Sequence, residues 1–504
     1  MKKIALIAGG LLMGVAAASH AQDVRIGMQD DPDTLDPHRS RTYAARIVFT
    51  SLCDKLVDID GKLQFVPKLA KSWSWNDDST ALTFKLREDA VFHDGSKFDA
   101  KAAKANLERA ISLPESQRKS ELASVSQVEA PDDYTLVIKV KQPDAPLLAQ
   151  LSDRAGMMLS PKSFAGADSA STVGRNPVCS GPYKFVERVQ NDRIVLEKFD
   201  KYYDAKDYAF DKVTFFAIPD STVRLSNLKS GGIDILERAN PSDVPEIKKD
   251  AGLVFKPVTG LGFRQFMFNV SNGEKSKTNP FSNKLVRQAF QLTIDRDAIN
   301  EVIGGGIFPP AQQPFPLASP YLSEKFPVVK PDIAKAKALL KQAGMETVQA
   351  QLTFANNTIE ASTAEMVQAM AAQAGFQLSL RPTEYAAMLA ESAKGNFQVD
   401  MRGWSGRVDP DGNIFSFVTC KGTLNDGKYC NPKVDEILRK ARTISDQAKR
   451  KAVYDEAQTI LQDELPSMYI YYQPWPFVVQ KKVQGFDPFP DGMIRLKGVS
   501  FSKG

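Results

Sequence analysis

The sequence predicts an α/β protein of two or three domains, in which two lobes are joined by two crossings of the chain. Its 504 residues are more than a single hydrophobic core normally serves. Strand-like and helix-like segments alternate along the chain without an internal repeat. The residue composition changes at residues 256–262, which are small and flexible, and at residues 469–476, which are aromatic. These two stretches enclose a compact α/β segment. A chain of this kind can open and close around a ligand.

The first 21 residues have the pattern of a cleaved secretory signal peptide. Two lysines precede an apolar stretch over residues 4–18, and Ser19-His20-Ala21 forms a small-x-small cleavage site. The apolar stretch is shorter than the roughly twenty residues of a membrane anchor, and no cysteine follows it to carry a lipid. We therefore expect a soluble, exported protein that begins at Gln22 and, in a cell with an outer membrane, lies in the periplasm.

Strands are predicted along the first half of the chain. Apolar and polar residues alternate over residues 24–28, before a loop rich in Pro and Asp over residues 30–37. Further strands are predicted over residues 134–140, 193–199 and 212–218. The small, flexible run over residues 256–262 marks the first crossing, and a helical region begins near Asn283.

Helices dominate the later pattern. One is predicted over residues 332–343, with Asp332 at its N-cap. The stretch 352–404 then predicts a β-α-β-α-β unit, whose strands should be parallel and joined by right-handed crossovers. A last helix over residues 446–462 leads through an aromatic stretch into a strand over residues 477–479.

The loop over residues 401–415 is the main candidate for a ligand site. It follows the last strand of the β-α-β-α-β unit, so it should lie at the carboxyl edge of a parallel sheet, where ligands bind in open α/β folds. It gathers the indole of Trp404, the guanidinium of Arg407 and the carboxylates of Asp409 and Asp411. Such a mixture suits a small zwitterionic ligand. The alternative is a solvated turn, since Asp-Pro-Asp-Gly is also turn chemistry.

The four cysteines favour disulfides, because an exported protein meets an oxidising environment. A polar, hairpin-like stretch separates Cys420 from Cys430 and can bring them together, and we predict a second bridge between Cys53 and Cys179. Four cysteines allow three connectivities, among which the sequence alone does not choose.

Composition argues against several other partners and chemistries. The formal charge is +5, or about +3 once two lysines leave with the signal peptide, and basic residues are interleaved with acidic ones, so no nucleic-acid partner is expected. Only His38 and His93 remain in the mature chain, which argues against a histidine-rich zinc site. No nucleophile elbow, phosphate loop or dinucleotide fingerprint is present. We therefore expect no cofactor, no metal and no catalysis.

Several motifs resemble those of the family 5 extracellular solute-binding proteins, which bind peptides, nickel or glutathione for bacterial ABC importers. The signature is Ala-Lys-Ser-Trp at residues 70–73, followed by Leu-Thr-Phe-Lys-Leu-Arg-Glu-Asp-Ala-Val-Phe-His-Asp-Gly at residues 82–95. Supporting matches, in the family's order, are residues 34–37, 180–185, 286–290, 294–296 and 431–435. The resemblance covers essentially the whole mature chain.

The resemblance implies a large periplasmic-binding-protein fold of class II type with two hinge crossings. It places residues 22–260 and 471–504 in lobe one, residues 261–470 in lobe two, and an inserted subdomain over residues 60–177 of lobe one. It also implies that a ligand is captured between the lobes and delivered to an inner-membrane ABC permease without chemistry. We expect the protein to act as a monomer.

Two ligand-binding roles are carried over from the dipeptide-binding branch of that family. There, an aspartate after a Gly-Trp stretch holds the ligand's amino group, and the matching residue is Asp409. The arginine that holds the carboxylate has no match, since residues 356–364 contain no Arg. We predict that Arg407 replaces it, so that Arg407 and Asp409 bind opposite charges of the ligand while Trp404 packs its apolar part. Further candidates for the carboxylate are Arg264, Arg381 and Arg402.

Two aromatic residues, Tyr43 and Phe263, lie where the family places cleft-lining side chains. Both are predicted to contact the ligand, with hinge or core packing as the alternative. The ligand itself stays open between a short peptide or peptide-like organic ion and a nickel-chelate or glutathione-type compound. An exported hydrolase or a receptor on the same scaffold is the competing function.

Overall fold

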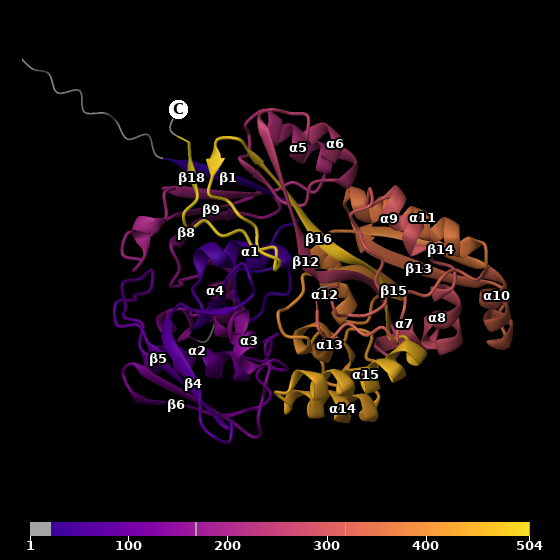
Figure 1. Ribbon diagram of the computed structural model, residues 1–504, viewed down its shortest axis with the longest axis horizontal. Helices are drawn as coiled ribbons and strands as arrows, with labels where there is room; N and C mark the ends of the chain where they lie inside the picture. The colour runs from indigo at the N-terminus through magenta and orange to yellow at the C-terminus, as the bar shows by residue number, and fades with distance from the viewer. Residues whose placement is uncertain (1–21, 167–168, 318, 503–504) are drawn as a thin grey trace, which may run out of the picture.

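The computed structural model describes residues 22–166, 169–317 and 319–502. The predicted signal peptide, residues 1–21, lies outside these described residues. Figure 1 shows the early, indigo to magenta, segments on one side of the molecule and the orange segments on the other, with the strands labelled β12 and β16 between them. We call the residues before β12 and after β16 the first part, and the residues between these two strands the second part.

One mixed sheet of ten strands runs through both parts. In spatial order its strands are β14 (Phe376–Thr383), β13 (Val348–Ala355), β15 (Val399–Trp404), β12 (Leu253–Phe268), β16 (Ser467–Gln480), β11 (Ile235–Leu236), β1 (Asp23–Met28), β10 (Lys212–Ala217), β9 (Arg193–Lys198) and β8 (Tyr183–Val189). β12 and β16 pair antiparallel along most of their length. β16 also pairs with β11 of the first part, and β12 also pairs with β15 of the second part. These two long strands therefore connect the parts.

The run over residues 256–262 lies inside β12, where a flexible border was predicted. Its pairing with β16 is interrupted by a shift of register between Val258 and Gly262. A Cβ on Gly260 would lie 2.0 Å from the carbonyl oxygen of Gln473, and one on Gly262 would lie 1.9 Å from that of Trp404. The glycines are therefore required by the close approach of neighbouring strands, and strand pairing overrides their low strand propensity.

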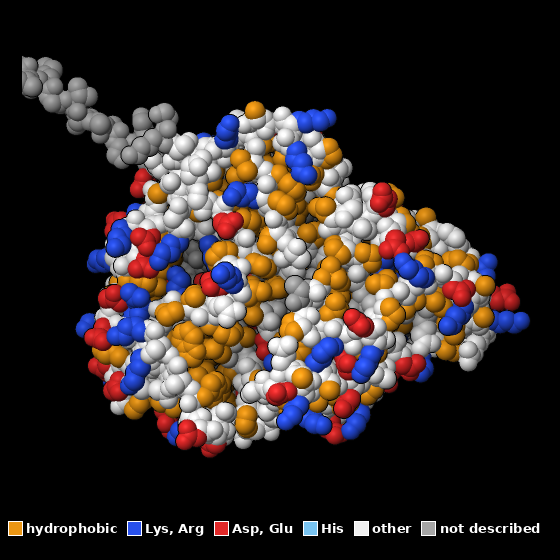
Figure 2. Space-filling model, viewed as in Figure 1, with side chains coloured by type: hydrophobic (Ala, Val, Ile, Leu, Met, Phe, Trp, Pro, Cys, Tyr) orange, Lys and Arg blue, Asp and Glu red, His pale blue; other side chains and the backbone are white. Residues whose placement is uncertain are grey.

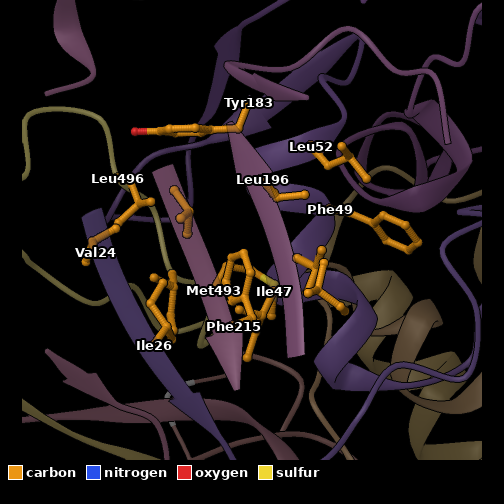
Figure 3. Packing of buried hydrophobic residues seen from close by; sticks show 14 of the residues in the cluster. Val24, Ile26, Ile47, Phe49, Leu52, Tyr183, Leu196, Phe215, Met493 and Leu496 are labelled. Carbon is orange, nitrogen blue, oxygen red and sulfur yellow. The ribbon is translucent and has the colours of Figure 1, made fainter. Parts of the chain in front are cut away.

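Both ends of the described chain contribute to one of the cores of the first part. Figure 3 shows side chains of β1, β9, β10 and α1 packed together with Met493 and Leu496, which follow β16. The other elements here are α1 (Tyr43–Leu52), α4 (Ser169–Arg175), α5 (Ser221–Lys229), α6 (Val244–Ile247), β2 (Val57–Ile59), β3 (Phe65–Pro67), β17 (Val483–Gln484) and β18 (Ser500–Phe501). The C-terminal segment thus completes the core that the N-terminal strand begins.

A separate antiparallel sheet with its own core lies between β3 and β8 along the chain. Its strands, in spatial order, are β4 (Ala70–Trp75), β5 (Ala81–Leu86), β7 (Thr135–Val140) and β6 (Val125–Asp132), accompanied by α2 (Ala100–Ser112) and α3 (Leu147–Leu151). Leu82, Phe84 and Leu86 of β5 are buried and alternate with less buried residues. The motif at residues 70–95 therefore builds this sheet.

The second part contains the predicted β-α-β-α-β unit. β13 is parallel to both β14 and β15, which confirms the parallel arrangement. The helices of this part are α7 (Gly273–Lys277), α8 (Lys284–Gln291), α9 (Arg296–Val302), α10 (Ile333–Gln342), α11 (Thr358–Ala372), α12 (Tyr385–Ala393), α13 (Asp411–Val418), α14 (Pro432–Arg442) and α15 (Gln447–Glu464). β12 sends Phe266 and Phe268 into one core and Phe263 and Met267 into another, because successive side chains point to opposite faces.

Two helices begin where they were predicted, and the cap predicted at Asp332 is formed. The carboxylate of Asp332 accepts a hydrogen bond from the backbone N–H of Lys335 at 2.9 Å and begins α10. Asp446 accepts one from Lys449 at 2.8 Å and begins α15. Each cap satisfies a backbone donor that the first helical turn leaves free. Local chemistry alone is therefore enough to place these helix ends.

Both predicted disulfides are formed. Cys53, directly after α1, is bonded to Cys179, and their Cα atoms are 4.9 Å apart. Cys420 and Cys430 close the loop between α13 and α14, with Cα atoms 4.3 Å apart. The first bridge ties segments 126 residues apart in sequence, and the second closes a short local loop.

The surface mixes charges of both signs. Figure 2 shows Lys and Arg side chains interspersed with Asp and Glu over the visible face, in line with the nearly balanced composition. Over the part of the chain that the structure describes, no helix combines the length and apolar character needed to cross a membrane.

Candidate functional site

Two cavities lie where the first and second parts meet. The Trp404 cavity is small, with a volume of about 30 Å³, which is enough for a water molecule. Its walls include Gln29, Asp30, Tyr43 and Arg238 from the first part, Asn357, Tyr385, Trp404 and Ser405 from the second, Arg264 from β12, and Gln473 and Trp475 from β16. The Arg407 cavity has a volume of about 20 Å³, with walls that include Arg46, Lys55, Asp153, Gly406, Arg407 and Asp491.

Strand ends bring these walls together. β13 and β15 are parallel, so Ala355 and Trp404 at their carboxyl ends reach the same edge of the sheet. The loop after β15 turns at Gly406, whose φ of 81° favours glycine and where a Cβ would lie 2.2 Å from the carbonyl carbon of Leu261. Trp404, Ser405 and Gly406 are buried, so this loop is no solvated turn.

Trp404 lines the first of these cavities and is held on several sides. Its Nε1 donates to Oδ1 of Asn413 at 2.9 Å, and its ring meets the ring of Phe417 edge to face at 5.0 Å. The guanidinium of Arg407 lies 4.1 Å from the Trp404 ring centroid, a cation–π contact. The predicted pair of indole and guanidinium is therefore brought together at the junction.

Tyr43 also lines the Trp404 cavity, from the first turn of α1. Its ring is stacked on that of Trp475, with centroids 4.4 Å apart and planes 5° apart. Its hydroxyl donates to the carbonyl oxygen of Gly492. Tyr43 is thus both a cavity residue and part of the packing that joins α1, β16 and the C-terminal segment.

Each guanidinium in the Trp404 cavity has a carboxylate partner. Arg238 contacts Asp30 at 2.8 Å and also Glu237, and Arg264 on β12 contacts Glu360 on α11. Burial raises the pKa of Glu360 against the opposing effect of Arg264. The charges of this cavity are therefore largely paired within the protein.

Two residues that line the Trp404 cavity have a polar atom without a partner among the described residues. Nδ2 of Asn357 and Nε of Arg264 are buried and, among the described residues, have no hydrogen-bond partner. Buried donors are normally satisfied, so unpaired donors that line a cavity indicate where a bound molecule supplies acceptors.

In the Arg407 cavity, side chains of the two parts meet directly. Nε of Arg407 lies 2.6 Å from Oδ2 of Asp153, and Nη1 of Arg46 donates to Oγ of Ser405 at 2.7 Å. Arg46 also contacts Asp153, at 3.0 Å. One carboxylate of the first part therefore lies between a guanidinium of its own part and one of the other part.

Asp409 and Asp411 have structural partners. Asp409 accepts from both terminal nitrogens of Arg450 on α15 at 2.7 Å, and Asp411 is paired in the same bidentate way with Arg442 on α14, at 2.8 and 2.7 Å. Asp409 is not among the residues that line either cavity. The carboxylate predicted to bind an ammonium group instead fastens the loop to the helix behind it.

Phe263 is a core residue in the structure, where cavity contact was predicted. It is fully buried and meets the rings of Tyr469 and Phe417 edge to face, at 4.9 and 6.1 Å. The next residue along β12, Arg264, lines the Trp404 cavity. Because side chains alternate along a strand, one position decides between the core and the cavity.

Arg402, another arginine that was a candidate for the ligand's carboxylate, is paired with carboxylates of the protein. Arg402 on β15 is buried against Asp400 and Asp426, the latter at 2.6 Å. Arg41 of the first part reaches the same Asp426, also at 2.6 Å. Arg402 therefore supports another contact between the two parts and lines neither cavity.

Several cavity residues were missed by the sequence reasoning. Asp30 and Asn357 lie two residues beyond the ends of β1 and β13, so the rule that ligands bind beyond strand ends could have identified them. Arg238 lies equally close to the end of β11, but a strand of two residues has no alternating pattern that the sequence could display, and Arg46 lies inside α1. Only the folded arrangement brings these two arginines to the junction.

Of the two histidines of the first part, His38 is buried and His93 is partly buried, and neither lines either cavity. Nδ1 of His38 lies 2.8 Å from Nη1 of Arg109, and burial lowers the pKa of His38 to about 3. Burial likewise lowers the pKa of His93 to about 4. No group of three or more His, Cys, Asp or Glu side chains within residues 22–166, 169–317 and 319–502 could hold a metal ion.

Comparisons with known proteins agree with this architecture. The family model for bacterial extracellular solute-binding proteins, family 5 Middle, matches residues 64–425. The dipeptide-binding protein of Escherichia coli (strain K12) is 27% identical over 541 residues, with 99% of each chain covered. The glutathione-binding protein GsiB of Pectobacterium atrosepticum is 27% identical over 514 residues, covering 99% of this chain and 98% of its own.

A solved structure extends the likeness to three dimensions. The ABC transporter-associated periplasmic binding protein DppA from Helicobacter pylori, in complex with the peptide STSA, is 25% identical and has a TM-score of 0.88. The match covers 96% of this chain and 99% of that one, so the fold is that of the large periplasmic binding proteins. This chain belongs to the family 5 bacterial extracellular solute-binding proteins, the non-catalytic substrate-binding components of ABC importers.

Proposed function

We propose that this protein captures a short peptide or a peptide-like organic ion between two lobes in the periplasm and delivers it to an inner-membrane ABC permease. Lobe one comprises residues 22–260 and 471–504, with an inserted subdomain over residues 60–177, and lobe two comprises residues 261–470. Residues 1–21 act as the export signal. The protein works as a monomer, and no bond is made or broken.

The observation that carries the proposal is a cavity with walls from both parts of the molecule. Tyr43 and Arg238 come from the first part, Asn357 and Trp404 from the second, and Arg264 from β12. A ligand in this position touches both lobes at once, so its binding energy favours their closed arrangement over an open one. This is how a protein without catalytic machinery can both hold a solute and signal that it is loaded.

The two connecting strands supply the hinge in this proposal. β12 and β16 are the two strands that continue from one part into the other, and their pairing shifts register between Val258 and Gly262. Contacts such as Arg46 with Ser405 and Arg407 with Asp153 then form on closure. A hinge of this kind needs changes at only a few backbone positions.

We assign ligand contact to Trp404 and Tyr43, which offer aromatic surface, and to Asn357 and Arg264, which offer unpaired donors. Arg407 is assigned a charged group of the ligand. The two relatives are described as binding a dipeptide and glutathione, which are both peptide-like molecules with amide and carboxylate groups. A glutathione-type ligand is therefore the alternative within this class, and a nickel chelate is a more distant one.

Tryptophan fluorescence can test the proposal, because Trp404 and Trp475 both line the cavity. Di- and tripeptides are titrated into the protein while emission is recorded, and calorimetry gives the stoichiometry. We expect saturable binding of one ligand per chain, a raised melting temperature, and recovery of the ligand unchanged. The matched control is Trp73→Phe in β4, which should leave the signal intact, whereas Trp404→Phe should reduce it.

Release of cleaved peptide in the same experiment would contradict the proposal and favour the hydrolase. Native mass spectrometry of the gently purified protein gives an independent check. It should show the mass of one chain with one small molecule, and a pure ligand-free dimer would contradict the assigned mode of action.

A further inference from the structure

The loop over residues 420–430, which we call the disulfide loop, lies between α13 and α14 and reaches across the junction of the two parts. Within it, Oδ2 of Asp426 lies 2.6 Å from Nη2 of Arg41, a residue of the first part. The carboxylate side chain is 4% exposed and the guanidinium side chain 11% exposed, so salt in the solvent screens this ion pair little. The loop therefore contributes a buried charge to the contact between the parts.

Arg41 is bound from across the junction. Its Nη1 donates to the carbonyl oxygen of Leu389 on α12 at 3.1 Å, and its Nη2 donates to Asp426 at 2.6 Å. Its Nε is buried and has no hydrogen-bond partner among the described residues. Both partners of the guanidinium thus belong to the second part. Separation of the parts would release Arg41 into water without breaking either bond to its own part.

A second set of contacts across the junction surrounds Ser120 of the first part. Its Oγ lies 2.9 Å from Oγ of Ser416 on α13 and 3.1 Å from Oγ1 of Thr423 in the disulfide loop. Its carbonyl oxygen accepts from Nη1 of Arg442 on α14 at 3.1 Å. The carbonyl oxygen of Arg442 accepts from the backbone N–H of Ala145, ahead of α3, at 2.8 Å, and Figure 1 shows α13 and α14 on this side of the second part. The disulfide loop and its flanking helices therefore form one contact surface.

The disulfide loop is fastened to the second part independently of these contacts. Nδ2 of Asn425 donates to two carbonyl oxygens on either side of it, at 2.9 and 2.6 Å. Nδ2 of Asn272 donates to the carbonyl oxygen of Asp426 at 2.8 Å. The disulfide restricts the loop further. Asp426 is therefore presented in a fixed position, and little ordering is needed when it meets Arg41.

These contacts are separate from the cavities to which the ligand is assigned. Arg41, Asp426, Ser120 and Thr423 line neither the Trp404 cavity nor the Arg407 cavity. Contacts that exist only in the closed form stabilise that form whatever the ligand is. Because apparent affinity falls with the fraction of protein that is competent to bind, their loss should weaken every ligand by the same factor.

We infer that the disulfide loop is a latch, which holds the two lobes closed through Asp426 and Arg41 at a place that the ligand does not touch. This inference rests on the proposed function, since a latch needs two lobes that open and close around a ligand. Arg41 and Asp426 are positioning residues, because they act on the arrangement of the lobes. The latch sets how long the loaded form lasts and leaves the choice of ligand to the cavities.

Affinity for chemically different ligands tests the latch. Ala-Ala, Ala-Phe and glutathione are titrated by calorimetry into the full mature protein and into Arg41→Gln, and dissociation rates are followed by tryptophan fluorescence. We expect Arg41→Gln to raise the dissociation constant of every probe that binds by one common factor of about five, mainly through faster dissociation. Arg193→Gln, at an exposed ion pair on β9, is the matched control and should leave the affinities unchanged.

A double-mutant cycle shows whether Arg41 and Asp426 act as a pair. Asp426→Asn should weaken the probes, and adding Arg41→Gln should weaken them no further. Arg402 keeps its contact with Asp400 in Asp426→Asn, so we expect the variant to fold. Melting curves of the ligand-free variants check this. Fully additive losses would show that the two residues act separately, and the latch would be wrong.

The native bridge has its own test in Cys420→Ser combined with Cys430→Ser. Loosening the loop should raise the dissociation constants of the same probes by at least about twofold. In the background of Asp426→Asn, opening the bridge should add little, because the loop then has no charge to present. A loss of affinity that is as large in that background would contradict a role of the bridge in the latch.

The closed form can also be trapped without a ligand. Ser120→Cys and Thr423→Cys place two thiols where the hydroxyl oxygens lie 3.1 Å apart, so a mild oxidant should join them only when the lobes are closed. Arg41→Gln should slow this cross-linking by about the factor that it applies to the dissociation constants. Arg193→Gln again serves as the control, and peptide mass mapping identifies the new bridge.

The outcomes separate the latch from the function on which it rests. Unchanged affinity in Arg41→Gln would overturn the latch and leave the capture of peptide-like ligands standing. Weakening that differs by more than about threefold between probes would also overturn it, because Arg41 would then contact the ligand. If no probe binds to any form, the proposed function fails, and cross-linking decides the latch alone. An unaltered cross-linking rate in Arg41→Gln would then reject it.

Discussion

Arg407 and Asp409 lie two residues apart in one loop, yet their partners come from different parts of the molecule. Arg407 pairs with Asp153 of the first part and lines a cavity, whereas Asp409 is held by Arg450 of its own part. The loop therefore has a junction side, which faces the other part, and an anchored side, which faces α14 and α15. Charge on the anchored side should serve stability, and charge on the junction side should serve binding.

The largest effect is expected on the anchored side, from Asp409→Ala. The substitution leaves Arg450, whose side chain is 4% exposed, without its carboxylate. Removing one partner of a buried ion pair costs about 3–5 kcal/mol of the free energy of unfolding. Urea unfolding measures this loss. Glu436→Ala on α14, which breaks an exposed pair with Lys433, is the matched control and should change stability by less than about 1 kcal/mol.

An equal loss in Glu436→Ala would show that the comparison between buried and exposed pairs does not hold here. Ligand affinity gives a second readout. Folded Asp409→Ala protein should bind its ligand within about threefold of the unchanged protein, and loss of binding without loss of stability would return Asp409 to the ligand site.

Asp144 approaches the anchored side from across the junction and should make stability depend on pH. Burial raises its pKa to about 6, despite the opposing effect of Arg442 and a hydrogen bond from Ser124, and nearby Asp411 and Asp409 raise it further. A raised carboxyl pKa means that the folded protein binds this proton more tightly than the unfolded chain. The contribution is therefore present below about pH 4 and is lost as pH rises through about 6, by about 2–3 kcal/mol.

Unfolding titrations at pH 4, 5, 6 and 7 measure the slope of the free energy of unfolding against pH. Asp144→Asn should flatten it and should be more stable than the unchanged protein at pH 7. Glu274→Gln, at an exposed position on α7, should leave the slope as it is. An unaltered slope in Asp144→Asn would assign the pH dependence to other groups.

Asn413 connects the two sides of the loop, and its loss should have an intermediate effect. Its Oδ1 accepts from Nε1 of Trp404 at 2.9 Å and from the backbone N–H of Arg407 at 2.8 Å. Asn413→Ala leaves both buried donors unsatisfied, at a cost of about 2 kcal/mol. Because Asn413 holds Trp404 of one cavity and Arg407 of the other, ligand affinity should fall together with stability. The exposed Asn396→Ala is the control, and unchanged ligand affinity in folded Asn413→Ala protein would contradict the positioning role.

The smallest change in stability is expected on the junction side, from Arg407→Gln. The substitution removes one of three guanidiniums that share Asp153, so relief of repulsion partly offsets the lost ion pair. We expect the free energy of unfolding of the ligand-free protein to change by at most about 1 kcal/mol. A loss as large as that of Asp409→Ala would erase the distinction between the two sides.

Local patterns predicted much of the fold. Apolar periodicity and caps were enough to place β1, α10 and α15, and the strand–helix alternation after residue 348 predicted three parallel strands that the structure contains. These features depend on neighbours within about one element, which the sequence displays directly. The same reasoning placed Trp404 at a strand end, where it lines the Trp404 cavity.

Register and face were harder to predict. Phe263 and Arg264 are adjacent, and both are compatible with a strand, but only the pairing of β12 with β15 and β16 shows which of them faces the cavity. The glycines of residues 256–262 indicated a flexible border, whereas the structure uses them for close approach within β12. A one-residue shift exchanges the two faces of a strand, so a residue pattern without a partner strand leaves the choice open.

The sequence by itself determined the element types, the parallel unit, the disulfide-forming loop at Cys420 and the family signature. Only the tertiary structure decided the partners of each charge. Arg450 reaches Asp409 across 41 residues, and Asp153 meets Arg407 from the other part of the molecule. Such pairings depend on how packing places segments that are far apart in the sequence. The sequence around each residue does not show which distant residue lies next to it in the fold. For this reason the loop's composition indicated a binding site, while its folded surroundings decided which of its charges faces a ligand.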